Sequence, residues 1–382
     1  MNALPLSPNP GRWRSVLIQL GVLAALALMV SVALRVAMGK IGAQQTATGF
    51  GFLGTTSGFD ISESFIAYDA TMSYGRAILS GLLNTLVAAL IAGVLATIIG
   101  LAVGLARLSS NFMLRNVMLA ISELIRNVPL LLQLIVWYAL VINLFPATRE
   151  AEPTLGVIVT NRGVFFPSIA EVGKSQLSWI LPVAWIILCC GYIVAMRSPK
   201  FADRAPHAAI RAVFWALTLG LLVCWIGVVQ ITRPALDGFN IQGGVSISPE
   251  MTALVLGLAI YSGAFIGEVI RSGILSVPQG QVEAAYAIGL SPYHRMRRVV
   301  LPQALRLILP PLSNVYLSLA KSTSLGVAIG FPDLSSVIGT TINQSGQAIE
   351  GVLIQVAAYL AISLLVWGAV ALYDRRTKYV VR

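Results

Sequence analysis

LNTLVAALIAGVLATIIGLAVGLA, residues 83–106, contains no charged side chain. A helix needs about 20 mostly apolar residues to cross the roughly 30 Å of hydrocarbon in a bilayer. The run also lacks the alternation of polar and apolar residues that is typical of a strand in a membrane barrel. The sequence therefore predicts a transmembrane helix at this place.

The rest of the chain shares this apolar character. Apolar residues make up 57% of its 382 residues and charged residues 11%, whereas a soluble domain carries about 25% charge. This shortage excludes a water-soluble enzyme and a disordered protein, since too few ionised groups remain to solvate a surface. We predict an all-α integral membrane protein with about eight transmembrane helices. The predicted spans are 16–38, 78–106, 113–145, 178–196, 211–230, 250–272, 303–330 and 350–373.

The first segment has two interpretations. Arg12 and Arg14 precede an apolar stretch, as they would in a secretory signal. The stretch from Val16 to Leu34 is, however, longer than the apolar core of about 7 to 15 residues that is usual in a signal peptide. We therefore predict a membrane anchor here rather than a cleaved signal.

The basic residues predict the orientation of the spans. The chain has 26 Lys and Arg against 15 Asp and Glu, a net charge of +11. With eight spans and a cytoplasmic start, sixteen basic residues fall in cytoplasmic segments and six on the opposite side, as the positive-inside rule requires. Both termini are therefore predicted in the cytoplasm. We expect no nucleic-acid partner, because no soluble domain carries the charge.

The chain has no motif for an energy source or for catalysis. SIAEVGKS at 168–175 ends like a phosphate-binding loop, but Ser168 replaces the first glycine and the segment lies in a predicted exterior loop. Cys189, Cys190 and Cys224 lie in predicted spans, and their spacing fits neither a disulfide framework nor a metal site. We therefore expect no catalytic residue, metal or cofactor in this chain.

The most informative segment is the predicted cytoplasmic loop RSGILSVPQGQVEAAYAIGLSPYHRMRRVVLPQALRLILPPL at 271–312. Its composition favours a short helix from Pro278 to Ile288, followed by Gly289 as a residue free to take a positive φ. Ser291 is typical of an N-cap, and the proline after it is typical of the first position of a second helix. The segment therefore predicts a helix, a tight turn and another helix.

The residues of this loop leave two interpretations open. Ala284 and Ala285 offer a small, rigid surface next to Glu283, which can insert into a groove on a partner and transmit rigid-body motion. An ordinary amphipathic connector lying on the membrane surface explains the composition equally well.

The run Glu283-Ala284-Ala285, then Gly289, then Leu301-Pro302 resembles the EAA loop of ATP-binding-cassette (ABC) importer permeases. The longer string QGQVEAAYAIGLSPYHRMRRVVLPQALRLILPPLSN at 279–314 is similar to the branch of this family that carries polar amino acids. The resemblance implies a membrane subunit without enzymatic activity of its own.

Three other segments resemble the same branch. A GAY-x-x-E segment is matched at 261–268 with the tyrosine displaced, and an R-G-T-P-x-L-x-Q run is matched at 126–133 without its Gly and Thr. A K-D/S-T-S-L run is matched at 321–325. The extra first span and the inserted pair at 178–230 resemble the larger permease subunit of general L-amino-acid importers.

The resemblance also implies a division of the chain. The family core has five helices, and three extra helices are added to it here. We expect an N-terminal tail, first span and exterior loop at 1–77, the first part of the core at 78–145, an inserted exterior loop and two extra spans at 146–249, and the second part of the core at 250–382, with the EAA loop at 273–302.

The resemblance implies several partners in a bacterial inner membrane. They are a second permease chain, which we expect to be a paralogue, two ABC ATPase chains that hold ATP and Mg, and a periplasmic amino-acid-binding protein. The residues expected to couple this chain to the ATPase are Glu283, Ala284, Ala285, Gly289, Leu290 and Ser291. Replacing Gly289 with Asp is expected to uncouple transport from ATP hydrolysis.

Charged and polar residues inside spans are candidates for the substrate path, because burying a charge in a bilayer is costly. The candidates are Arg126, Gln133, Glu268, Lys321, Ser322 and Thr323. Two structural alternatives compete, since Glu123 with Arg126 and Glu268 with Arg271 are spaced to form ion pairs within one helix. Lys321 is the stronger candidate, because it follows a predicted helix break at Pro310-Pro311 that frees backbone carbonyls.

Two further points stay open at the level of sequence. The loops at 39–77 and 146–177 can dock a receptor or can simply be solvated, and the first of them carries Asp60, Glu63 and Asp69. A secondary transporter or channel that works alone is the alternative function, although such a protein is expected to show inverted repeats, and none is visible between the two halves. An intramembrane enzyme would need a constellation of His or carboxylate residues at depth, which the sequence lacks.

Overall fold

The computed structural model describes residues 49–170, 207–228, 230–238 and 240–377, with helical pieces at 19–25, 27–29, 31–32, 184–185, 187–189 and 192. The predicted spans 16–38 and 178–196 lie largely outside the described residues, and so do both termini. The described part is mainly helical, which confirms the predicted class of fold.

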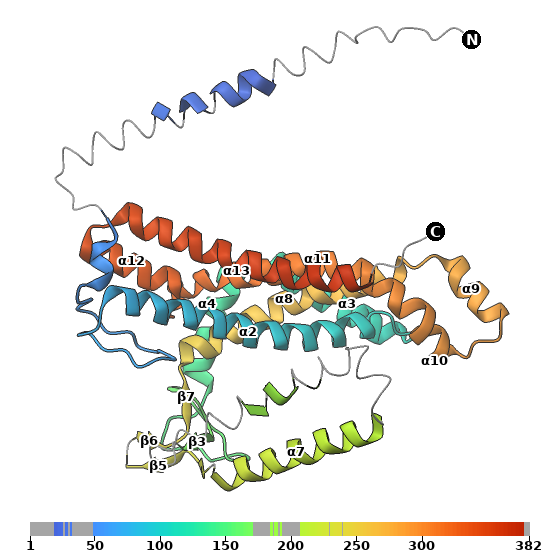
Figure 1. Ribbon diagram of the computed structural model, residues 1–382, viewed down its shortest axis with the longest axis horizontal. Coiled ribbons are helices and arrows are strands. Elements are labelled where there is room, and N and C mark those ends of the chain that lie inside the picture. Colours follow the sequence, from blue (N-terminus) through green and yellow to red (C-terminus); the bar gives the residue numbers. More distant parts are fainter. Residues whose placement is uncertain are drawn as a thin grey trace.

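Three helices are each long and apolar enough to cross a membrane. They are α2 (Tyr74–Ala106), α8 (Pro249–Leu275) and α13, which runs over Ala348–Thr377 and is apolar up to Gly368. Figure 1 shows them running side by side along the long axis of the molecule together with α11 (Leu301–Ser322). Two bent pairs of helices raise the number of candidate spans among the described residues to five. The predicted total of eight is not reached in this part of the chain.

Glycines let α2 and α8 pack at close range. A Cβ atom on Gly100 would lie 2.5 Å from Cγ2 of Ile266 and 3.0 Å from the carbonyl oxygen of Gly263. A Cβ on Gly267 would lie 3.0 Å from Cγ1 of Val103. Close approach of this kind is what small residues permit between membrane helices. The two helices therefore form the centre of the fold.

The predicted span 113–145 is not one straight helix, because the chain bends sharply inside it. Helix α3 (Phe112–Asn127) and helix α4 (Leu130–Leu144) meet at 104°. Val128 lies between the two helices, directly before Pro129, and its backbone is extended at φ −88° and ψ 129°. A proline disfavours helical backbone in the residue before it, which explains why the helix ends here.

The predicted helix break at Pro310-Pro311 is wrong, because α11 runs through both prolines as a helix. After Ser322 the chain tightens into η3, a 3₁₀ helix at Thr323–Ile329, and α12 (Leu334–Ser345) follows at an angle of 56° to the segment before it. Gly330, at φ 86°, ends the 3₁₀ helix in the left-handed region. The turn at Gly330 therefore lies 19 residues beyond Pro311.

The insert between α4 and α8 contains small sheets that the sequence did not predict. Strands β1 (Ile158–Thr160), β2 (Gly163–Phe166) and β7 (Val245–Ile247) form one antiparallel sheet, in which Val164 pairs with Ile247. Two further pairs are β3 (Ser168–Ala170) with β4 (Gln230–Thr232) and β5 (Ala235–Asp237) with β6 (Asn240–Gln242). Strands from both ends of the insert thus pair with each other. Helix α7 (His207–Val228) lies apart from the main bundle, at the bottom of Figure 1.

The segment before α2 covers one end of three helices, α2, α12 and α13. Its 3₁₀ helix η1 (Phe50–Gly54) places Phe52 against Tyr74 with ring centroids 5.9 Å apart. The backbone N–H of Gly49 donates to Oε1 of Glu350, in the first turn of α13, at 2.7 Å. Apolar residues of this segment also pack on a small core between α2 and α12. This exterior loop is therefore folded onto the bundle.

Candidate coupling loop and translocation path

The helix, turn and helix predicted in the loop at 271–312 are confirmed. Helix α9 (Gln279–Ala287) follows Pro278, and Gly289 takes φ 77° just past its end. The N–H of Leu290 donates to the carbonyl of Ala285 at 3.1 Å, and the N–H of Gly289 donates to Tyr286 at 2.9 Å. These two bonds are the pattern of a Schellman motif, which needs a left-handed residue such as glycine.

The second helix starts as the sequence predicted. The Ser291 side chain accepts a hydrogen bond from the N–H of His294, and Pro292 takes the first position of α10 (Pro292–Arg295). The chain continues through η2, a π-helical turn at Met296–Val300, directly into α11. A displacement of the turn can therefore pass to a membrane helix without a flexible link between them.

Most of the predicted coupling residues lie on the surface. Glu283, Ala284, Gly289 and Ser291 are exposed and Leu290 is half-buried, whereas Ala285 is buried. Ala285 thus anchors α9 rather than presenting a contact surface.

Sequence reasoning missed two residues of this surface. Tyr286 and Ile288 are 72% and 76% exposed. The Tyr286 ring lies 5.8 Å from the guanidinium carbon of Arg295, which links α9 to α10. In so short a helix, no periodicity could have separated these two residues from buried ones.

A cluster of five charged side chains lies where α2, α3 and α8 meet. Oε2 of Glu268 is 2.5 Å from Arg107 Nη1 and 3.4 Å from Arg126 Nη1, while Oε1 is 3.2 Å from Arg271 Nη2. Arg126 also reaches Glu123 at 3.4 Å. The two ion pairs predicted within helices are therefore present, and Glu268 joins them into one network.

Arg107 is the residue of this cluster that the sequence did not reveal. It follows the last residue of α2 and is only 6% exposed. By count along the chain it belongs to a cytoplasmic loop, and only the packing of α2 on α8 brings it to Glu268. Because both carboxylate oxygens of Glu268 are occupied by guanidinium groups, the structure favours a bond between helices over contact with a substrate at this residue.

Gln133 has a structural partner of its own. Its side-chain N–H group donates to the carbonyls of Ile125 at 2.7 Å and Val128 at 2.9 Å. These carbonyls belong to the end of α3, where a helix leaves acceptors unpaired. The side chain therefore closes the bend between α3 and α4.

Lys321 lines a pocket of about 450 Å³, with a mostly apolar lining, at the other end of the bundle. The side chains of Ser324, Ser335, Gln355 and Tyr359 also line it. The Tyr359 hydroxyl is 3.1 Å from the Ser335 hydroxyl, to which Gln355 donates at 2.9 Å. The pocket thus combines one cation with hydroxyl and amide groups and with the apolar side chains of Val356 and Leu360.

The other two residues of the predicted run lie beside this pocket. Thr323 is buried and its hydroxyl donates to the carbonyl of Ala320 at 2.9 Å, so it serves the backbone. Ser322 is half-buried at the end of α11.

The six predicted path residues form two separate groups. Lys321, Ser322 and Thr323 lie at one end of the bundle, and Arg126, Gln133 and Glu268 lie at the other. The hydroxyl of Thr85 on α2 accepts from the N–H of Leu334, next to the Lys321 pocket. Arg107, one residue past the end of α2, contacts Glu268. These positions on α2 are 22 residues apart, or about 33 Å at 1.5 Å per residue.

The acidic side chains of the exterior loop are used within the fold. The Ser248 hydroxyl, at the start of α8, donates to Glu63 Oε2 at 2.5 Å, and burial raises the pKa of Glu63. Asp69 accepts from the N–H of Thr71 at 2.8 Å, and its bonds to Thr71 lower the pKa of Asp69. Asp60 accepts from the N–H of Ala70 at 3.1 Å. These three carboxylates therefore stabilise the loop and its contact with α8.

Comparison with known proteins gives consistent matches. Residues 96–379 match the model of a family described as binding-protein-dependent transport system inner membrane component. The general L-amino acid transport system permease protein AapQ of Rhizobium johnstonii is 38% identical over 85% of this chain and 82% of its own length. The glutamate/glutamine/aspartate/asparagine transport system permease protein BztB of Rhodobacter capsulatus is 36% identical over 96% of this chain and 94% of its own. A crystal structure of an amino acid ABC transporter with histidines has a TM-score of 0.47 at 23% identity, covering 79% of this chain and 95% of that one.

Proposed function

The chain belongs to the family of binding-protein-dependent transport system inner membrane components, and we propose that it carries amino acids across the bacterial inner membrane. It is the permease subunit of an ABC importer, whose ATPase is a separate chain and whose substrate is delivered by a binding protein. The amino-acid substrate is supported by the names of the relatives AapQ and BztB.

The preformed turn at Gly289 carries the proposed mechanism. Its positive φ and the two Schellman bonds hold α9 and α10 at a fixed angle, and α10 leads without a break into α11. In the proposal, α9 and the turn dock in a groove of the ATPase, so that nucleotide-driven closure moves the membrane helices. Glu283, Ala284, Leu290 and Ser291 provide the contact surface, while the buried Ala285 holds the helix in place.

Gly289→Asp tests this coupling. A Cβ atom at position 289 would meet no atom of this chain within 4 Å, so the change causes no clash within the chain, but the φ of 77° strains any residue with a side chain at this position. Asp and Asn both tolerate a left-handed backbone, and Gly289→Asn is therefore the matched control without the charge. We expect Gly289→Asp to lower uptake about tenfold or more while ATP hydrolysis by the assembled complex persists. Normal uptake by Gly289→Asp at wild-type assembly would contradict the proposal.

The Lys321 pocket is the part of the path that we propose to hold the substrate carboxylate. Its ammonium supplies the cationic end, and Ser324, Ser335 and Gln355 supply polar groups within the same pocket. Arg126, Gln133 and Glu268 are assigned instead to the cytoplasmic end of the helices, where they bond to one another or to the backbone. Ser322 and Thr323 support the pocket through the end of α11.

Lys321→Met tests the substrate assignment. The change removes the charge and keeps an unbranched side chain, so we expect the concentration needed for half-maximal uptake to rise about tenfold or more. Lys321→Arg keeps the charge and serves as the control, with a smaller effect expected. The measurement is uptake of labelled amino acids by cells that express equal amounts of the complex. Unchanged uptake kinetics in Lys321→Met would remove this residue from the path.

The assembly proposed around this chain contains a second permease, which we take to be a paralogue, two ATPase chains and one binding protein. Within the chain, 78–145 and 250–382 supply the proposed core, with the EAA loop at 273–302. Residues 1–77 and 146–249 are additions to that core. Both termini are proposed to lie in the cytoplasm, on the side of the basic residues that flank the coupling loop.

A further inference from the structure

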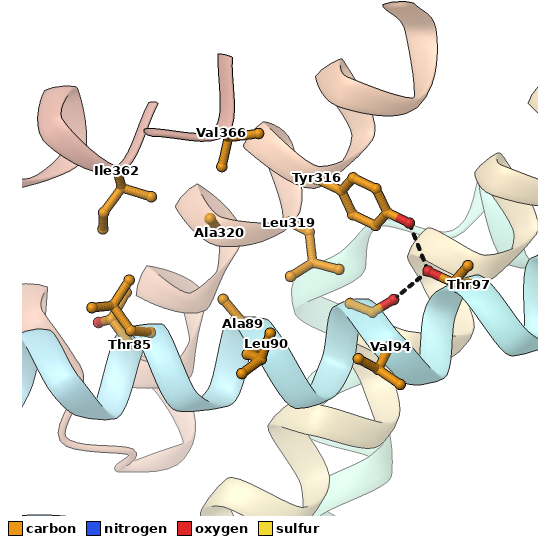
Figure 2. A pocket seen from close by; sticks show the side chains of 12 residues that line it. Thr85, Ala89, Leu90, Val94, Thr97, Tyr316, Leu319, Ala320, Ile362 and Val366 are labelled. Atoms are coloured by element: carbon orange, nitrogen blue, oxygen red, sulfur yellow. Dashed lines mark hydrogen bonds between the residues drawn. The ribbon is translucent and has the colours of Figure 1, made fainter. Parts of the chain in front are cut away.

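An apolar groove runs along the outside of the bundle between α2, α11 and α13. Figure 2 shows side chains from these three helices around it, and its volume is about 340 Å³. Its few polar groups are already bonded: Thr97 is 2.6 Å from the Tyr316 hydroxyl and donates to the carbonyl of Gly93 at 2.7 Å, and Thr85 accepts from Leu334. The groove therefore suits an apolar occupant.

The floor of the groove is lined by small residues, so another helix can approach it closely. Ala89 and Gly93 of α2 are four residues apart, so they lie on one face of the helix. On the rim, Leu90 is 69% exposed. Small residues that let backbones approach are typical of contacts between membrane helices. The shape of the groove thus fits a helix with small residues of its own better than it fits a bulky one.

The segment that precedes α2 begins next to this groove. Gly49 is bonded to Glu350 at the start of α13, and Phe52 packs on Tyr74 at the start of α2. These contacts fix residue 49 between the exterior ends of the two helices that form the groove walls. The first predicted span ends at 38, and the ten residues that follow can reach at most about 35 Å.

The first predicted span has the matching surface. Its described pieces at 19–25 and 27–29 are helical, and they place Gly21 and Ala25 on one face, four residues apart. Leu20, Leu23 and Leu28 are all more than half exposed, so their apolar area is available for packing. We propose that this span lies in the groove, antiparallel to α2, with Gly21 and Ala25 toward the turns of α2 that carry Leu86, Ala89 and Leu90. The proposal rests on the eight-span topology, and not on the coupling loop or on the identity of the substrate.

The predicted topology gives the register. Arg35 and Arg76 mark the exterior ends of the first span and of α2. In an antiparallel pair, residues at equal distances from these ends lie at the same depth. Gly21 is fourteen residues before Arg35 and Leu90 is fourteen after Arg76, while Ala25 and Leu86 are each ten residues away. These two pairs are therefore the ones expected to meet.

Disulfide cross-linking in membranes tests the proposal. Two double-cysteine variants are made in a chain whose three native cysteines are changed to Ser: Gly21→Cys with Leu90→Cys, and Ala25→Cys with Leu86→Cys. They are expressed in cells that also express the partner subunits. A protease site inserted between 39 and 48 separates the first span from the rest. We expect the two fragments to remain joined after oxidation and cleavage, and to separate on reduction. Gly21→Cys with Val136→Cys is the control, because Val136 is similarly exposed but lies on α4.

Each other outcome overturns the proposal. Covalent dimers without joined fragments from one chain would place the first span of one permease against another copy. If neither pair forms a cross-link although uptake before oxidation is at the wild-type level, the groove is occupied by lipid and not by the first span. A cross-link of equal yield in the control pair would show that the span has no fixed place.

Discussion

At the scale of single residues, the charge network around Glu268 decides how three helices are joined. Glu268 contacts Arg107, Arg126 and Arg271, which belong to the ends of α2 and α3 and to α8 itself. The Arg107 side chain is only 4% exposed. A buried charge that loses its partner is strongly destabilising, because it stays desolvated without compensation. The network therefore fixes this end of the bundle.

Glu268→Gln is expected to destabilise the transporter. Loss of a fully buried pair costs about 3–5 kcal/mol, and the Glu268 side chain is 30% exposed, so we expect about 1–3 kcal/mol. Glu123→Gln is the matched control, because that carboxylate is 46% exposed and contacts Arg126 at 3.4 Å. Thermal unfolding of the purified complex measures both. Equal unfolding temperatures for Glu268→Gln and the wild type would contradict this account.

The sequence predicted the members of this network in part. The pairs Glu123 with Arg126 and Glu268 with Arg271 follow from helical spacing, which depends only on neighbours along the chain. Arg107 and Glu268 are 161 positions apart, and their contact depends on how α2 crosses α8. The same limit applies to Lys321, because its pocket is completed by Gln355 and Tyr359 of α13.

At the scale of helices, the contact between α2 and α8 depends on glycines whose side-chain space is already filled. Gly100→Ala would place Cβ 2.5 Å from Ile266 Cγ2, which forces the helices apart. Overpacking of this kind costs about 1–3 kcal/mol. Gly93→Ala, on the same helix, would place Cβ 3.9 Å from the Tyr316 ring, an ordinary contact. We expect only Gly100→Ala to lower the yield of folded protein and its unfolding temperature, as size-exclusion chromatography and thermal unfolding can show.

Composition and hydrophobic length were enough to predict the long helices, and local residue preferences were enough to predict α9, its turn and α10. They were not enough to place the bends. Pro129 ended a helix, whereas Pro310 and Pro311 did not. A proline inside a membrane helix is tolerated when neighbours supply the freed groups with partners, and that is a property of packing. The short strands escaped prediction because runs of three or four residues carry little periodicity.

At the scale of the whole molecule, the distribution of basic residues predicts which side of the membrane each segment faces. Leu155 in the exterior insert is 98% exposed, which makes it a suitable reporter for the periplasmic side. Ser7 and Val381 report on the two termini. Single cysteines at these three positions, in a chain whose native cysteines are changed to Ser, can be labelled with a maleimide that does not cross the inner membrane.

We expect Leu155→Cys to be labelled in intact cells, and Ser7→Cys and Val381→Cys to be labelled only after lysis. This pattern follows because the sixteen basic residues assigned to the cytoplasmic side are costly to move across the membrane. Labelling of Ser7→Cys in intact cells would reverse the first span. If the first segment were instead a cleaved signal, Ser7→Cys would be removed with it, and the mature chain would not be labelled even after lysis. The three results are distinct, so one experiment tests the orientation of the termini and the anchor together.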